Sequence, residues 1–261
     1  MTDSFAPLVL FDLDGTLLDS ARDLHAAMNR LLAEKSEAPV AFDVFRPVVS
    51  KGARAMLKQS FLHADEHTRE LLLPEFLSIY ERGLAEFSNV FDGIDEVLAH
   101  IEAQDALWGI VTNKPYYLAE PLVEKLGWSQ RSAILLGGDS LPNKKPEPDQ
   151  LLHACAVLGI APEKSVYIGD DERDVQAANA ANMRSIGALW GYHPLDDLPE
   201  RWLADDLAET PLDLISGRLV AGRGFLSPRP PRRPGPPEPA TRRRRWWRWA
   251  KVDSNRSPAR H

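Results

Sequence analysis

The chain has 261 residues, of which 44% are hydrophobic and 26% charged, and it contains one cysteine, Cys155. This composition is typical of a globular protein and excludes a chain disordered throughout, while the single cysteine excludes an intramolecular disulfide framework. No apolar run approaches the roughly 20 residues that span a bilayer. The N-terminus carries Asp3 and none of the basic residues that open a secretory signal, so we expect a cytoplasmic protein.

The net charge of −7 combines two regions of opposite sign. Residues 217–261 hold 13 of the 31 lysines and arginines but only two acidic residues, whereas residues 1–216 hold 18 basic and 36 acidic residues. The same C-terminal segment holds 8 of the 21 prolines and 3 of the 7 tryptophans. So abrupt a change predicts a boundary near Ser216, between an acidic folded body and a basic tail.

Short apolar runs alternate with helical patterns along the body. The first run, Leu8–Phe11, ends at Asp12 as a buried parallel strand would. Later runs predict further strands at Leu107–Val111, Ala133–Leu136, Ser165–Ile168 and Arg184–Ala188. Apolar residues at helical spacing predict helices at Ala119–Leu126, Asp149–Leu158 and Val175–Ala180. This alternation predicts an α/β fold with a Rossmann-like, mostly parallel sheet, whose site lies at the carboxyl ends of its strands.

One stretch interrupts the alternation. Between about residues 20 and 92 there is no buried-strand run, and the pattern is helical throughout. The helices expected there are Ala21–Leu32, Ala53–Leu62 and Glu66–Leu84. We interpret this stretch as an α-helical cap inserted after the first strand. The expected domains are a core of residues 1–19 and 93–216, a cap of residues 20–92 and a tail of residues 217–261.

Two carboxylates, Asp12 and Asp14, stand two residues apart just past the first predicted strand. Acidic groups so placed are costly unless a cation lies between them. Mg²⁺ suits such a place, because it is held by few carboxylates together with phosphate oxygens. One carboxylate is then available as a nucleophile and the other as an acid/base group. The alternative is an exposed turn with two solvated acids, which the preceding apolar run makes less favourable.

The string Asp12-Leu13-Asp14-Gly15-Thr16 resembles the first motif of the haloacid dehalogenase-like hydrolases. Three later segments resemble that family's remaining motifs, in the same order and at predicted strand ends. They are Val111-Thr112-Asn113-Lys114, Lys144-Lys145-Pro146-Glu147-Pro148-Asp149 and Ile168-Gly169-Asp170-Asp171-Glu172-Arg173-Asp174. The resemblance covers residues 8–190 and implies the family's α/β fold.

The resemblance also implies roles for the acidic residues. Asp12 would attack phosphorus and form an aspartyl-phosphate, while Asp14 would protonate the leaving oxygen and later take a proton from water. Mg²⁺ would be held by Asp12, by the backbone carbonyl of Asp14 and by Asp170. Asp174 would be a ligand through water or a support for Lys145.

The phosphoryl oxygens would be held by Thr112, the amide of Asn113 and Lys145, since a phosphate dianion needs donors and positive charge around it. The choice of Lys145 over Lys144 depends on the resemblance. Considered alone, Thr112 is equally a strand-end hydroxyl that bonds the backbone, and Asp171 is equally the cap of a following helix.

Asp14 discriminates within the family. Dehalogenase members lack this second acid, because a halide leaving group needs no proton, so the resemblance favours phosphoryl chemistry. Phosphomutases of the family share all four motifs and are the alternative. We expect hydrolysis.

Two basic residues of the predicted cap are candidates for substrate recognition. The segment 48–56 resembles the specificity segment of phosphoglycolate phosphatase-like proteins, and Lys51 and Arg54 within it would pair with a substrate carboxylate. The alternative is a basic helix face in water. Segments 50–56, 107–115 and 119–121 also resemble N-acetylmuramate 6-phosphate phosphatases. Both substrates carry a phosphate and a carboxylate, so the expected partner is a small phosphorylated metabolite of either kind.

The C-terminal tail departs from this family. The segment 229–237 is rich in proline and unsuited to helix or sheet, and residues 242–249 combine arginines with tryptophans. Such a combination also suits nucleic acid or an anionic membrane surface, which would make the protein an adaptor rather than an enzyme. We favour instead a tail without regular structure that folds back on the acidic body, or that results from a reading-frame shift.

Overall fold

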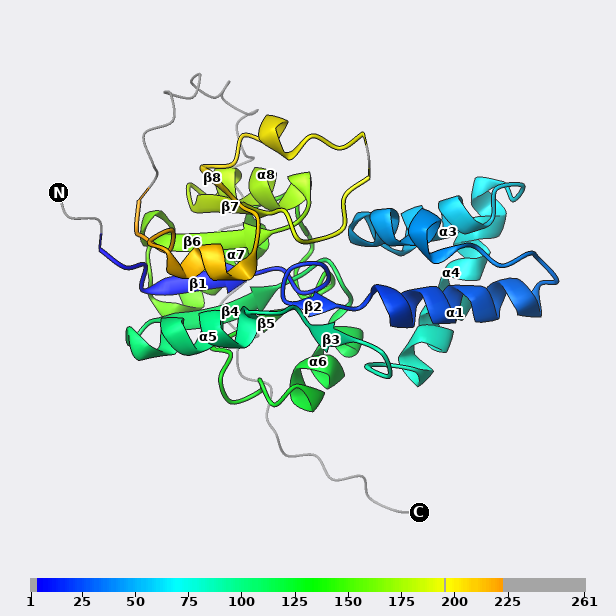
Figure 1. Cartoon of the computed structure of the whole chain (residues 1–261), viewed down its shortest axis with the longest axis horizontal. Coiled ribbons are helices and arrows are strands. Elements are labelled where there is room, and N and C mark those ends of the chain that lie inside the picture. The colour runs from blue at the N-terminus through cyan, green and yellow to red at the C-terminus, as the bar shows by residue number, and fades with distance from the viewer. Residues whose placement is uncertain (1–3, 195, 223–261) are drawn as a thin grey trace, which may run out of the picture. The chain divides into compact units, whose positions relative to one another are not determined.

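The computed structural model describes residues 4–194 and 196–222 (Figure 1). Its main sheet has six strands in the order β5-β4-β1-β6-β7-β8, and every neighbouring pair is parallel. The strands of this sheet are β1 (Leu8–Phe11), β4 (Leu107–Val111), β5 (Leu135–Leu136), β6 (Ser165–Gly169), β7 (Arg184–Ala188) and β8 (Asp206–Ala208). The predicted Rossmann-like α/β fold is therefore confirmed.

Both faces of the sheet are covered, which explains the continuous apolar run of β1. Val9 and Phe11 pack on one side with α5 (Ile94–Ala103) and α6 (Tyr116–Lys125). Leu8 and Leu10 alternate with them and pack on the other side, with α7 (Asp149–Leu158) and α8 (Glu172–Ala180). Four 3₁₀ segments complete the described chain: η1 (Arg46–Lys51), η2 (Pro162–Lys164), η3 (Pro199–Arg201) and η4 (Pro211–Ile215). Among the described residues, no helix has the length and apolar character needed to cross a membrane.

Most differences from the predicted elements lie at their ends. The strand expected at Ala133–Leu136 is only the two-residue β5, and the edge strand β8 was not predicted, because three residues carry too weak a pattern. Helix α8 begins three residues before the expected Val175. Its first turn is polar and is stabilised by a capping box between Asp171 and Asp174, so its apolar spacing starts late.

A second group of helices follows β1 and has a hydrophobic cluster of its own (Figure 1). These helices are α1 (Ala21–Glu34), α2 (Phe42–Phe45), α3 (Ala53–Ser60) and α4 (Glu66–Arg82). The two strands that flank the group, β2 (Leu18–Asp19) and β3 (Asn89–Val90), pair antiparallel. We propose that residues 20–92 form the cap, and the separate cluster and the paired flanking strands support this division.

The chain remains part of the body beyond the expected boundary at Ser216. Leu219 is 1% exposed and packs in the sheet's core cluster, and its carbonyl accepts a 2.9 Å hydrogen bond from the amide of Ala6. Arg218 pairs with Asp206 at 2.5 Å. The expected boundary is therefore too early, because charge averaged over the segment hides one apolar residue that packs. Residues 223–261, with the proline-, arginine- and tryptophan-rich part of the expected tail, lie outside the described residues.

Ending the chain after Ser216 is expected to lower the free energy of unfolding by about 2–5 kcal/mol, because the buried Leu219 side chain is lost. Ending it after Gly222 removes none of these contacts and is the matched control. Thermal melts of the two truncated chains beside the full-length protein measure the difference. Equal melting temperatures for the two truncations would contradict a structural role for residues 217–222.

Candidate active site

Three predicted site residues follow three neighbouring strands. Asp12 follows β1, Thr112 follows β4 and Asp170 follows β6, and β1 lies between the other two strands. Because the strands are parallel, their carboxyl ends meet at one edge of the sheet. The structure thus brings together residues that are up to 158 positions apart in the sequence.

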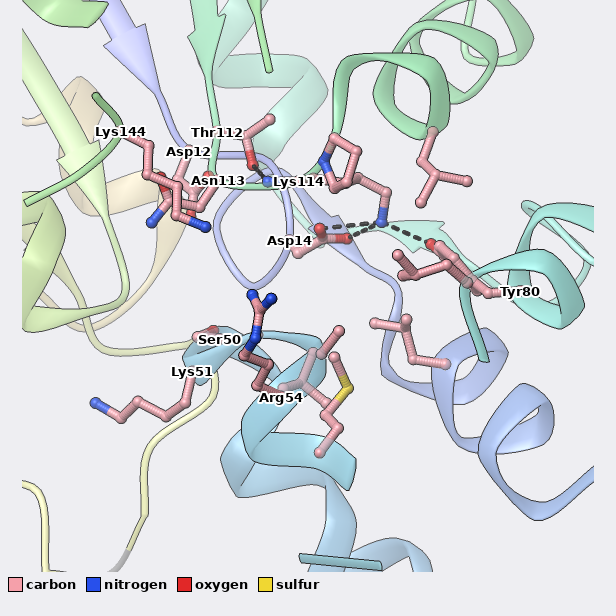
Figure 2. Close-up of a pocket in the computed structure, with 18 of the residues that line it drawn as sticks. Asp12, Asp14, Ser50, Lys51, Arg54, Tyr80, Thr112, Asn113, Lys114 and Lys144 are labelled. Atoms are coloured by element: carbon pink, nitrogen blue, oxygen red, sulfur yellow. Dashed lines mark hydrogen bonds and ion pairs between the residues drawn. The ribbon is translucent and has the colours of Figure 1, made fainter. Parts of the chain in front are cut away.

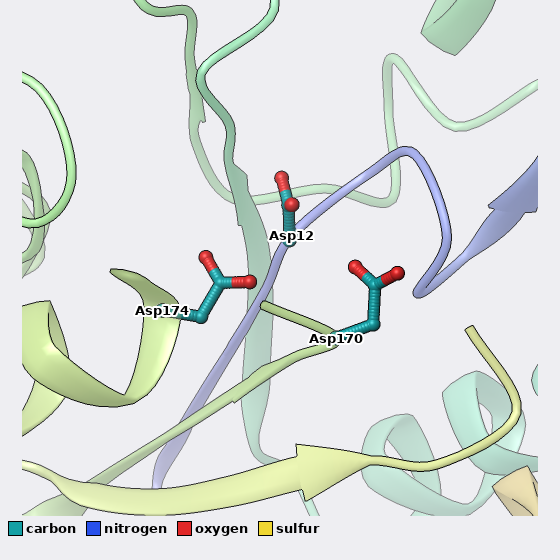
Figure 3. A group of neighbouring side chains, drawn as sticks. All are labelled: Asp12, Asp170 and Asp174. Carbon is teal, nitrogen blue, oxygen red and sulfur yellow. The ribbon is translucent and has the colours of Figure 1, made fainter. Parts of the chain in front are cut away.

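Asp12, Asp170 and Asp174 form a cluster of buried carboxylates (Figure 3). One oxygen from each lies within 4.8 Å of the others. Burial, followed by repulsion from Asp12 and Asp174, holds the pKa of Asp170 well above its usual range. Burial likewise raises the pKa of Asp174, although Lys145 opposes that rise. The cluster therefore has a strong electrostatic demand for a cation.

Lys145 supplies part of that positive charge. Its side chain is 1% exposed, and its Nζ lies 3.0 Å from Asp12 and 2.6 Å from Asp174. Nζ also donates to the Tyr167 hydroxyl at 2.7 Å. Burial lowers the pKa of Lys145, but Asp12 and Asp174 outweigh this effect and leave its pKa raised. The predicted lysine is thus a buried cation fixed beside the predicted nucleophile.

The residues fit Mg²⁺. Three ionised carboxylates against one ammonium leave two negative charges uncompensated, and carboxylate oxygens are the ligands that this ion prefers. Asp170 is also held in place, since it accepts hydrogen bonds from the Ser50 hydroxyl at 2.6 Å and the Tyr192 amide at 2.8 Å. Gly15 has φ +85°, and a Cβ there would overlap the Asp170 carboxylate. The tight turn after β1 therefore leaves room for a rigid acidic site.

Asp14 lies apart from this cluster, in an ion pair that sequence analysis did not identify. Both of its carboxylate oxygens lie 3.1 Å from Lys114 Nζ, which also donates to the Tyr80 hydroxyl at 2.8 Å (Figure 2). Lys114 directly follows the predicted Asn113 at the end of β4, so its place beside two site residues was the available signal. Tyr80 gave no signal, because only the packing of α4 brings it to the site.

The two predicted phosphate-binding residues at the end of β4 lie close to the nucleophile and line the same cavity. The Thr112 hydroxyl accepts a 3.2 Å hydrogen bond from the Lys114 amide, which leaves its own hydrogen available to donate. The Asn113 side chain donates to the Lys145 carbonyl at 3.0 Å. The Asn113 side chain therefore orders the loop that carries Lys145.

The two predicted recognition residues of the cap are engaged differently. Lys51 Nζ pairs with Asp171 at 2.9 Å and Asp197 at 2.8 Å, and its side chain points away from Asp14 (Figure 2). Arg54 is 65% exposed and pairs with Glu70 of α4 at 2.6 Å. Both residues line the cavity. Lys51 thus connects the cap segment to core loops, whereas an exposed ion pair of the kind Arg54 makes is weak and leaves its guanidinium available.

A cavity of about 410 Å³ joins these groups. Asp12, Asp14 and Thr112 line its core side, beside Lys144 and Arg173, which sequence analysis did not assign to a ligand. The opposite wall is aliphatic and comes mainly from the cap, with Leu24, Val49, Met56, Leu73 and Leu77. The cavity is therefore polar where the acids lie and apolar beyond them.

Comparison with known proteins matches this geometry to one family. The family model of the haloacid dehalogenase-like hydrolases matches residues 9–188. A phosphoglycolate phosphatase from Xanthomonas campestris pv. campestris is 51% identical over 210 residues, which cover 80% of this chain and 95% of that protein. An N-acetylmuramic acid 6-phosphate phosphatase from Pseudomonas putida is 42% identical over 79% of this chain and 93% of its own length.

Solved structures agree. The crystal structure of a predicted phosphoglycolate phosphatase from Haemophilus somnus superposes with a TM-score of 0.73 at 25% identity. The match covers 80% of this chain and 96% of that one.

Asp170→Asn removes one carboxylate from the cluster and preserves the size of the side chain. In EDTA we expect this variant to melt no lower than the wild type, because repulsion among buried carboxylates falls. Mg²⁺ should then stabilise the wild type by about 2.7 kcal/mol at about 100 times its Kd, and the variant far less. Thermal melts with and without Mg²⁺ measure both effects, with the exposed cap variant Asp43→Asn as control. An equal Mg²⁺-induced shift in wild type and Asp170→Asn would exclude Asp170 as a ligand.

Proposed function

This chain belongs to the haloacid dehalogenase-like hydrolases and is a phosphoric monoester hydrolase, and from that premise we propose that it hydrolyses a small carboxylated phosphomonoester with Mg²⁺ through an aspartyl-phosphate. The observation that carries the proposal is the cavity that Asp12 and Asp14 share with the aliphatic side chains of the cap. We also propose a cytoplasmic location, because one unpaired cysteine suits a reducing compartment.

Asp12 is the proposed nucleophile. A carboxylate oxygen attacks phosphorus, the bond from phosphorus to the ester oxygen breaks, and the phosphoryl group remains on Asp12 until water removes it. Lys145 lies 3.0 Å from this carboxylate and holds it in position. Thr112 and the amide of Asn113 are the proposed donors to the phosphoryl oxygens, where negative charge accumulates.

Asp14 is the proposed acid/base residue. It gives a proton to the departing alkoxide oxygen and then takes one from the water that attacks the aspartyl-phosphate, so the enzyme returns to its starting state. An alkyl ester needs this help because an alkoxide is a poor leaving group.

Asp12, Asp170 and the backbone carbonyl of Asp14 are the proposed Mg²⁺ ligands, with Asp174 bound through water or supporting Lys145. When bound there, the ion neutralises charge on the phosphoryl oxygens and on the acidic cluster. Because Asp174 pairs with Lys145 at 2.6 Å, the support of Lys145 is the better-founded of its two roles.

The cavity favours the larger of the two candidate substrates. Ligand pockets of about 300–1,000 Å³ hold molecules much larger than a two-carbon acid, and this one measures about 410 Å³. N-acetylmuramate 6-phosphate carries acetyl and lactyl methyl groups that match the aliphatic wall, whereas 2-phosphoglycolate offers one methylene. Each buried carbon of this kind contributes about 0.8 kcal/mol.

Phosphate release with Mg²⁺ should therefore favour N-acetylmuramate 6-phosphate over 2-phosphoglycolate by at least about tenfold in kcat/KM. p-Nitrophenyl phosphate is the reference ester. Asp12→Asn should release no phosphate from any of the three, because the amide is a poor nucleophile. A preference for 2-phosphoglycolate would reverse the substrate assignment. Hydrolysis of p-nitrophenyl phosphate alone would discard both substrates, and hydrolysis of none would overturn the proposal.

Arg54→Ala should raise KM for the carboxylated ester by about tenfold, because a charge-assisted hydrogen bond to the carboxylate is lost. Lys51→Ala should raise it less, because Asp171 and Asp197 already hold its ammonium. KM for p-nitrophenyl phosphate, which has no carboxylate, should change little. Lys58→Ala, an exposed lysine on the same helix as Arg54, is the control. Equal changes for both esters would mean that these two residues serve the structure and not the carboxylate.

A further inference from the structure

The ion pair of Asp14 with Lys114 is not explained by phosphate binding. Lys114 leaves the end of β4 and reaches the loop after β1, where its Nζ lies 3.1 Å from each carboxylate oxygen of Asp14. The lysine side chain is only 5% exposed. Within residues 4–194 and 196–222, Lys114 is the only cation paired with Asp14.

The lysine is itself fixed from two directions. Its amide donates to the Thr112 hydroxyl at 3.2 Å, which holds its backbone against the sheet edge. Its Nζ donates to the Tyr80 hydroxyl at 2.8 Å and lies 4.4 Å from the centre of that ring. Tyr80 is fully buried on α4 of the proposed cap. An ammonium held between the core and the cap is a rigid anchor for the acid it contacts.

The other contact of Asp14 is on one oxygen only. The Ser20 hydroxyl donates to Asp14 Oδ1 at 2.5 Å, and a single hydrogen bond leaves the carboxylate free to rotate about its Cβ–Cγ bond. The contact with Lys114 through both oxygens removes that freedom. Proton transfer to a departing oxygen requires a fixed direction and a short distance.

We propose that Lys114 and Tyr80 are positioning residues for Asp14, which orient its carboxyl group toward the leaving oxygen. The proposal rests on the proposed function, in which Asp14 protonates that oxygen. Lys114 acts on the proton-transfer step rather than on phosphate binding, and Tyr80 makes that step depend on the seating of α4.

The dependence of rate on the leaving group tests the proposal. p-Nitrophenolate leaves without a proton, whereas the alkoxide of an alkyl phosphate needs one. Lys114→Met, which keeps the length of the side chain and removes its charge, should lower kcat/KM by about 10–100-fold for the alkyl ester that the wild type hydrolyses best. The loss for p-nitrophenyl phosphate should be at most about threefold. Tyr80→Phe, which keeps the buried ring, should show the same selectivity with a smaller loss.

Two controls match these variants. Lys125→Met removes a lysine that contacts the backbone carbonyls of Leu84 and Ala85, away from Asp14. Tyr117→Phe removes the hydroxyl of an exposed tyrosine near the site. Neither change should alter the ratio of the two kcat/KM values.

A double-mutant cycle with Asp14→Asn separates the possible outcomes. Asp14→Asn alone should lose the alkyl ester selectively, and adding Lys114→Met should then cause no further selective loss. Equal losses on both esters for Lys114→Met would overturn the proposal and place the lysine on the phosphate or in the fold. If Asp14→Asn itself shows no selectivity, the acid role of Asp14 fails and this inference fails with it. If Asp14→Asn is selective and Lys114→Met is not, only the inference fails.

Discussion

The burial of several carboxylates around one ammonium is the constraint on which the rest of this structure depends. Asp12, Asp170 and Asp174 lie close together out of water, and Lys145 compensates for only part of their charge. Such a cluster persists only where the backbone fixes each acid and a cation completes the charge balance. The parallel sheet meets the first condition, because neighbouring strands end at one edge and their following loops hold the acids rigidly.

The cap is tied to this cluster rather than merely placed above it. The Ser50 hydroxyl donates to Asp170, and the carbonyl of Ser50 accepts from Arg173. Lys51 adds ion pairs to the core residues Asp171 and Asp197. The 3₁₀ segment η1 therefore contacts the acidic loop directly. Because the same segment lines the cavity, the wall that would contact the substrate is joined to the groups that would perform the chemistry.

The two kinds of phosphatase among the relatives differ in the size of the acid they are named for, and the core residues do not distinguish them. Both esters present a phosphate to Asp12 and a carboxylate to the cap. The difference lies in the apolar part of the substrate, and the only apolar surface that the cavity offers to it comes mainly from cap helices. Selectivity is thus expected from the aliphatic residues of α3 and α4, whereas the core supplies a chemistry common to the family.

The sequence alone determined the strand order along the chain, the cap insertion and the acidic and basic residues of the four motifs. It did so because a buried parallel strand is an unbroken apolar run, and a polar group directly after it must lie at the sheet edge. It did not reveal β8, the packing of Leu219 or the engagement of Lys51 with Asp171 and Asp197. Each of these depends on a partner distant in the chain, and local spacing carries no information about such a partner. The contact of Tyr80 with Lys114 belongs to the same class. Only the tertiary structure decided it, because a tyrosine on an amphipathic helix reads as core until packing places its hydroxyl beside a buried ammonium.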